Sequence, residues 1–112
     1  MKKFLVGVLV LTLAAPLAAE TWKGVALVDA GCASKAAVTE HPENHPTACA
    51  LRCGKSGYGI LVDGKFVKFD AKGNELAAAA LKKTDKKDHL TVTIEGEKDA
   101  DGSVRVTSLA LD

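Results

Sequence analysis

The sequence predicts a small, mainly β protein of five short strands, with one helix between the third and fourth strands. Three observations lead to this prediction. Apolar and polar residues alternate in several segments, an Asp-Gly pair separates two of these segments, and a helical period appears over residues 73–83. A long insertion without alternation, residues 29–57, follows the first strand and holds all three cysteines and two of the three histidines.

The first three strands follow from alternation and one turn. Residues 21–28, TWKGVALV, place Trp22 on the same face as Gly24, Ala26 and Val28. Residues 58–70 read as two antiparallel strands on either side of Asp63-Gly64, because glycine readily takes the positive φ that a tight hairpin needs.

The remaining elements follow from a change of period. In residues 73–83, GNELAAAALKK, we expect Asn74 to cap a helix whose apolar stripe includes Leu76 and Leu81. Alternation returns over residues 88–97, DHLTVTIEGE.

The last strand covers residues 103–112, SVRVTSLALD, after the turn DADG. Its apolar phase slips between Val106 and Leu109, which predicts a bulge near Thr107 and Ser108.

This order of elements is that of an OB-like β-barrel, in which five strands close on themselves and a long Cys/His-containing insertion separates strands one and two. A small open antiparallel sheet packed on the helix is the alternative.

The amino terminus predicts export. Lys2 and Lys3 precede an apolar run of about ten residues and then a small-residue stretch that ends at Ala19, the three parts of a secretory signal peptide. We expect cleavage after Ala19 and a single domain over residues 20–112. An uncleaved anchor is the alternative, but the run is short for a membrane span. The mature protein is therefore expected in the periplasm or outside the cell, as a monomer and free of the membrane.

Charge and size narrow the possible functions. Without residues 1–19 the chain has 93 residues, and the loss of Lys2 and Lys3 leaves 13 basic residues against 14 acidic ones. A neutral chain with few aromatic residues lacks the basic surface that nucleic acids require. A domain of this size has a small core, so a covalent or metal cross-link would help to stabilise it.

One interpretation of the cysteines is a disulfide. Cysteines in an exported protein are typically oxidised, so Cys32 is expected to pair with Cys49 or Cys53. The bond would close a loop of roughly 18 to 22 residues and stabilise the fold by about 3 kcal/mol. One thiol would remain free.

The alternative interpretation is a metal site. A predicted helical turn places Cys49 and Cys53 on one face, too far apart to bond each other easily. Ligands one turn apart can converge on one ion, and Cys32 with His41 or His45 would complete a Cys₃His set. Such a set suits zinc, or copper if a position stays open.

A third interpretation is thiol redox chemistry at Cys49 or Cys53, although their C-x-x-x-C spacing differs from the C-x-x-C of thioredoxin-like enzymes. The sequence has no paired general acid and base, no Ser/His/Asp motif and no phosphate-binding loop, so we do not expect an enzyme. The expected partner is a small ligand, a metal or a protein.

Several motifs together resemble a known group of proteins. They are DAGC at 29–32, a following histidine, CALRC at 49–53, GYGILV at 57–62 and a closing pair of strands. This combination resembles a group of small exported bacterial proteins with an OB-like β-barrel and covers most of the mature chain. The resemblance implies the barrel and export but no activity.

Overall fold

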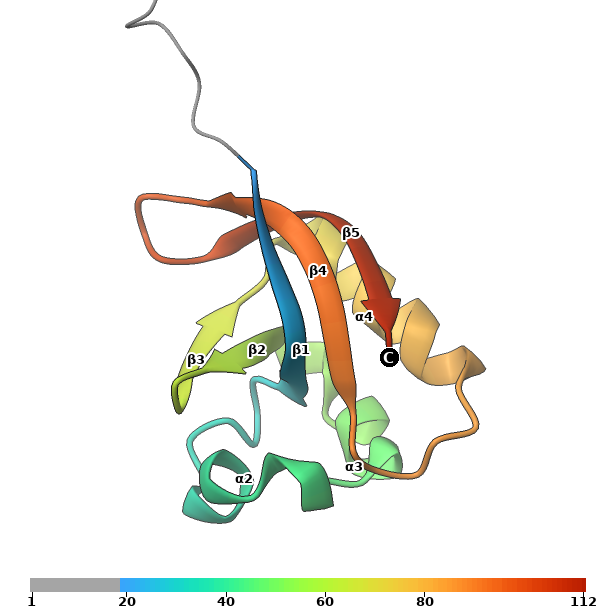
Figure 1. Ribbon diagram of the computed structural model, residues 1–112. Coiled ribbons are helices and arrows are strands. Elements are labelled where there is room, and N and C mark those ends of the chain that lie inside the picture. The colour runs from blue at the N-terminus through green and yellow to red at the C-terminus, as the bar shows by residue number, and fades with distance from the viewer. Residues whose placement is uncertain (1–18) are drawn as a thin grey trace, which may run out of the picture.

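The structure, a computed structural model, describes residues 19–112. The predicted signal peptide, residues 1–19, lies outside the described residues except for Ala19. Five strands form one antiparallel sheet in the order β3-β2-β1-β4-β5 (Figure 1). Their bounds are β1 Glu20–Asp29, β2 Tyr58–Val62, β3 Lys65–Lys68, β4 Thr91–Lys98 and β5 Val104–Leu111.

Three α-helices accompany the sheet within residues 19–112. The predicted helix between the third and fourth strands is α4 (Ala71–Lys83), which packs against β5. The insertion after β1 contains α2 (Ala36–Glu40) and α3 (Thr47–Arg52), and both lie at the end of the sheet where β1 ends (Figure 1). The mainly β class, the five strands and the position of the insertion are therefore confirmed.

The two edges of the sheet are β3 and β5. One isolated parallel bridge joins Phe69, just after β3, to Val104, the first residue of β5. No continuous ladder connects these edges within residues 19–112, so the sheet is not closed.

The core lies between the sheet and α4. Its buried residues come from four of the strands, from α3 and α4, and from two positions next to strands: Leu27, Ala50, Tyr58, Ile60, Phe69, Ala77, Leu81, Leu90, Val92, Ile94, Val104 and Val106. A second, smaller cluster contains Val28, Cys32, Ala33, Val38 and Leu61. This second cluster joins the insertion to the sheet, because it combines residues of β1 and β2 with residues of the insertion.

A bulge in β1 makes the predicted face of Trp22 wrong, whereas the predicted alternation of residues 25–28 is confirmed. Trp22 pairs with Ile94 and Val25 pairs with Val92, so β1 has one extra residue between these pairs. Gly24 lies there with a φ of 62°, a conformation that glycine adopts without a steric penalty. Trp22 consequently packs on the main core, whereas Ala26 packs against the second cluster.

The start of α4 also differs from the prediction. The cap is Asp70, whose Oδ1 accepts a hydrogen bond from the Gly73 amide at 3.0 Å. Asn74 lies inside the helix and instead accepts from the Tyr58 amide at 2.8 Å, joining α4 to β2.

The bulge predicted in the last strand is confirmed. Glu95 pairs with Ser108, but the next residue of β4, Gly96, pairs with Val106. Thr107 is therefore the extra residue of β5.

Candidate metal site

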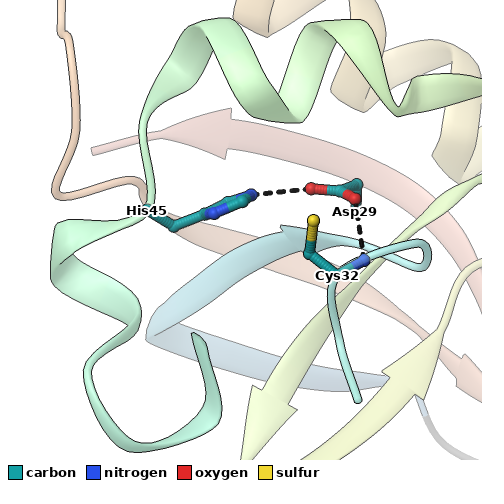
Figure 2. Close-up of side chains that lie close together, drawn as sticks. All are labelled: Asp29, Cys32 and His45. Carbon is teal, nitrogen blue, oxygen red and sulfur yellow. Dashed lines mark hydrogen bonds and ion pairs between the residues drawn. The ribbon is translucent and has the colours of Figure 1, made fainter. Parts of the chain in front are cut away.

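A buried aspartate and a buried histidine form the centre of the site. Asp29, the last residue of β1, is fully buried, and the His45 side chain is 6% exposed. The His45 Nε2 atom and the Asp29 Oδ1 atom are 2.7 Å apart (Figure 2). When the carboxylate is ionised, the ring nitrogen is the donor in this pair, because an ionised carboxylate can only accept hydrogen bonds. Burial makes such a bond short and strong, and expensive to break.

Cys32 completes the cluster. Its backbone amide donates to Asp29 Oδ2 at 3.0 Å, so the two carboxylate oxygens have separate partners. Figure 2 shows the Cys32 sulfur pointing toward the contact between His45 and Asp29. One ligand atom from each of the three residues lies within 4.8 Å of the other two, and all three residues are buried. The structure thus brings an oxygen, a nitrogen and a sulfur together.

The environment keeps the Cys32 thiol protonated. Burial raises the pKa of this thiol above its ordinary value of 9.0, and the charge of Asp29 and a hydrogen bond to it raise that pKa further. Lys35 opposes the shift, and Cys53 adds to it. A raised pKa disfavours the thiolate, so Cys32 lacks the activation of a redox nucleophile.

The chain on both sides of His45 is anchored to the loop that leads into β4. The Glu43 carbonyl accepts from the His89 amide at 2.9 Å. Two residues after His45, the Thr47 amide donates to the Lys87 backbone carbonyl and the Thr47 hydroxyl donates to the Lys86 backbone carbonyl, both at 2.8 Å. These contacts fix the position from which the imidazole reaches Asp29.

A third anchor holds α3. The Tyr58 hydroxyl donates to the Ala50 carbonyl at 3.0 Å, and Ala50 is fully buried. The predicted helical turn is confirmed here, since the Cys53 amide donates to the Cys49 carbonyl at 3.0 Å. Burial of the Tyr58 hydroxyl raises its pKa, because burial disfavours the charged form. The negative charges of Asp29 and Cys53 raise this pKa further.

Two of the five predicted ligands, Cys32 and His45, belong to the cluster. The side chain of His41 is 65% exposed and lies 3.3 Å from the Glu43 carboxylate. Cys49 is half-buried, and its sulfur accepts from Arg52 at 3.8 Å.

Cys53 is the second cysteine near this site. It is half-buried and packs against the second cluster, which contains Cys32. A Cβ atom at Gly31 would lie 3.6 Å from the Cys53 Cβ, so Cys53 faces the turn that carries Cys32. All three cysteines are free in the structure, and the disulfide of Cys32 therefore stays a prediction.

Asp29 was absent from the predicted ligands. Its sequence signal is the spacing Asp-x-x-Cys at the end of a strand, because an aspartate commonly accepts a hydrogen bond from a backbone amide two or three residues later. That spacing indicates a turn. The partnership with His45, 16 residues away, has no local signal.

None of the helices in residues 19–112 is long and apolar enough to cross a membrane. Comparison of the chain with protein-family models, with curated proteins and with solved structures found no match.

Proposed function

We propose that this protein binds a divalent metal ion, with zinc as the best candidate, through Asp29, Cys32 and His45. The observation that carries the proposal is the convergence of three different ligand atoms within 4.8 Å in a buried position. Aspartate, cysteine and histidine are the residues that bind zinc in proteins. Three protein ligands leave one tetrahedral position for a further ligand.

The fit requires a small local adjustment. Nitrogen and oxygen ligands about 2.0 Å from a tetrahedral zinc ion lie about 3.3 Å apart. The Nε2 and Oδ1 atoms are 2.7 Å apart as a hydrogen-bonded pair, so they would have to separate slightly and lose the proton between them. The Cys32 thiol would also lose its proton, which makes binding stronger as the pH rises.

The structure also supports a preorganised site. Asp29 Oδ2 stays bonded to the Cys32 amide while Oδ1 faces the histidine, so the carboxylate is already oriented by a second partner. The mixture of oxygen, nitrogen and sulfur ligands favours zinc over copper(I), since only one of the three ligands is the soft sulfur that selects copper(I).

Zinc titration of the reduced protein in competition with a chromophoric chelator tests this proposal. We expect the wild type to bind one equivalent. His45→Ala should lose that equivalent, whereas His41→Ala should keep it, because His41 is exposed and outside the cluster. A wild type that binds no zinc, or a His45→Ala variant that binds like the wild type, would contradict the proposal.

The second candidate function is an exported binding or interaction module whose insertion is held by a disulfide. The packing of Cys53 against the cluster of Cys32 favours Cys53 over Cys49 as the partner. Alkylation of the denatured, unreduced protein followed by mass spectrometry tests it: one free thiol supports the disulfide, and three free thiols contradict it.

We further propose that the sheet is a partly open OB-like barrel, and that the protein works in the periplasm or outside the cell. The Phe69–Val104 bridge between its two edges supports the first proposal. The pattern of residues 1–19 supports the second. The partner beyond a metal ion is proposed to be a small ligand or a protein, without an enzymatic reaction.

A further inference from the structure

The metal site and the disulfide compete for the same atom. The Cys32 sulfur is the only sulfur in the group of three ligand atoms found among the described residues. It is also the sulfur that either predicted disulfide would use. A sulfur bonded to another sulfur is no longer a thiolate and is a poor zinc ligand, so one molecule cannot have both features.

Cys53 is the cysteine best placed to convert the metal-bound state of Cys32 into the disulfide state. It faces the Gly31 turn, with its Cβ 3.6 Å from the position of a Cβ at Gly31, and it packs against the cluster that contains Cys32. Cys53 is half-buried whereas Cys32 is buried, so an external reagent reaches Cys53 first. Its neighbour Cys49 has the same intermediate burial but contacts Arg52 and lies outside this cluster.

We infer that Cys32 and Cys53 form a thiol switch that releases the metal ion when a small disulfide such as glutathione disulfide oxidises the site. This inference rests on the proposed function, because it names a way of regulating the same site. The reduced protein binds the metal, and the oxidised protein does not.

The reaction is thiol–disulfide exchange and balances without a further reagent. The Cys53 thiolate attacks one sulfur of the small disulfide, forms a mixed disulfide and expels one thiolate. The Cys32 sulfur, which has already lost its proton in the zinc-loaded protein, then attacks the Cys53 sulfur, forms the Cys32–Cys53 bond and expels the second thiolate. Two electrons pass to the small disulfide, two protons from water convert its halves to thiols, and the zinc ion leaves with its charge unchanged.

Both cysteines lie outside the strands of the sheet. Cys53 follows the last residue of α3, so its side chain is at the end of the helix and not within it. Cys32 lies in the turn after β1, between the end of a strand and α2. Formation of the bond requires the Cys53 side chain, which packs against the cluster of Cys32, to turn toward the Cys32 sulfur, and neither cysteine belongs to a strand.

The test starts from the reduced full-length protein loaded with zinc. Glutathione disulfide is added, and released zinc is measured with a chromophoric chelator. We expect the wild type and Cys49→Ser to release one equivalent. Cys53→Ser should retain its zinc at least ten times longer, because the attacking thiol is missing.

Peptide mapping identifies the bond independently of the variants. Cleavage after lysine and arginine separates the three cysteines into residues 24–35, 36–52 and 53–55. A cross-link between 24–35 and 53–55 that appears together with zinc release is the expected result.

Three results would overturn the inference. Equal release from Cys53→Ser and the wild type would show that Cys53 has no part in it. Zinc that stays bound in protein carrying the Cys32–Cys53 bond would show that the states do not exclude each other. Reduced wild type that never binds zinc would overturn the proposed function as well, and this result is visible before any oxidant is added.

Discussion

Two aspartate–histidine pairs in this protein have the same length and different surroundings. Asp29 and His45 are 2.7 Å apart in the interior, and Asp88 and His89 are 2.7 Å apart with both side chains at least half exposed. An exposed pair contributes little because water competes for both partners. A buried pair contributes more, because breaking it leaves polar groups without partners.

This comparison gives a prediction for two matched substitutions in the metal-free, reduced protein. Asp29→Ala should lower the free energy of unfolding by about 1–3 kcal/mol, since the His45 ring and the Cys32 amide both lose their partner. Asp88→Ala should change it by less than about 0.5 kcal/mol. Urea-induced unfolding measures both values. Equal effects of the two substitutions would show that the buried pair has no special role in stability.

At the scale of single residues, the sequence predicts that cysteines and histidines of the insertion form a site, but it does not predict which of them meet or that Asp29 joins them. Cys32 and His45 were predicted, because cysteines and histidines concentrate in one insertion. Asp29 was missed, and His41 is at the surface, since contacts between positions 16 residues apart depend on the tertiary fold. No local pattern distinguishes His41 from His45, as each precedes a proline.

At the scale of the elements, close approach of the backbone decides where glycine is needed. A Cβ at Gly59 would collide with the Val67 carbonyl of the neighbouring strand and lie 2.7 Å from the Phe66 ring. A Cβ at Gly31, beside the candidate metal site, would have its nearest contacts at 3.4–3.6 Å, which is ordinary packing.

We therefore expect Gly59→Ala to destabilise the protein by about 1–3 kcal/mol, because β2 and β3 would have to move apart. Gly31→Ala should stay within about 0.5 kcal/mol of the wild type. Urea-induced unfolding of both variants measures the difference in free energy of unfolding, provided that the slope of this free energy against denaturant concentration is the same for both. If Gly59→Ala were as stable as Gly31→Ala, the close pairing of β2 with β3 would be wrong.

The turn between β4 and β5 offers a pH prediction. The pKa of Asp101 is lowered from its ordinary value of 3.8, chiefly because the Ser103 hydroxyl and amide donate to its carboxylate at 2.7 Å and 3.0 Å. A lowered pKa in the folded state means that the turn is stabilised above pH 3.8, and that this contribution is lost as the pH falls through the folded pKa.

Ser103→Ala should return the pKa of Asp101 toward its ordinary value, since the first cause of the shift is removed. NMR titration of the Asp101 carboxyl carbon measures this pKa directly. An unchanged pKa in Ser103→Ala would assign the shift to the remaining backbone contact.

Most elements were predictable because their periodicity is local, and the errors have physical causes. The helical turn before Cys53 and the bulge at Thr107 follow from local spacing and are confirmed. The face of Trp22 was wrong because a bulge at Gly24 shifts the alternation, and a single glycine in a strand does not reveal on which side the extra residue lies. The cap at Asp70 was missed because Asn74 is also a good capping residue.

For the whole molecule, the insertion depends on contacts with distant parts of the chain. The segment that carries His45 is bonded to the loop before β4, and Asn74 of α4 is bonded to β2. A metal ion bound by Asp29, the last residue of β1, and by Cys32 and His45 of the insertion would join β1 to the insertion. Since a ligand that binds only the folded state stabilises it, metal binding should stabilise the entire domain.

We expect zinc to raise the melting temperature of the reduced wild type, with a stabilisation of about 2.7 kcal/mol when free zinc is 100 times the dissociation constant. Asp29→Ala should show no such increase. Magnesium serves as the control, because it prefers oxygen ligands and should leave the wild type unchanged. An equal increase with magnesium would indicate weak binding to surface carboxylates instead of the buried cluster.

The most direct measurement is the absorption spectrum of the reduced protein titrated with cobalt(II), which substitutes for zinc and gives a charge-transfer band when bound to a thiolate. The expected result is such a band at one equivalent in the wild type and in Cys49→Ser, and its loss in Cys32→Ser. A wild type without the band, or a Cys32→Ser variant that keeps it, would contradict a metal site built on Asp29, Cys32 and His45.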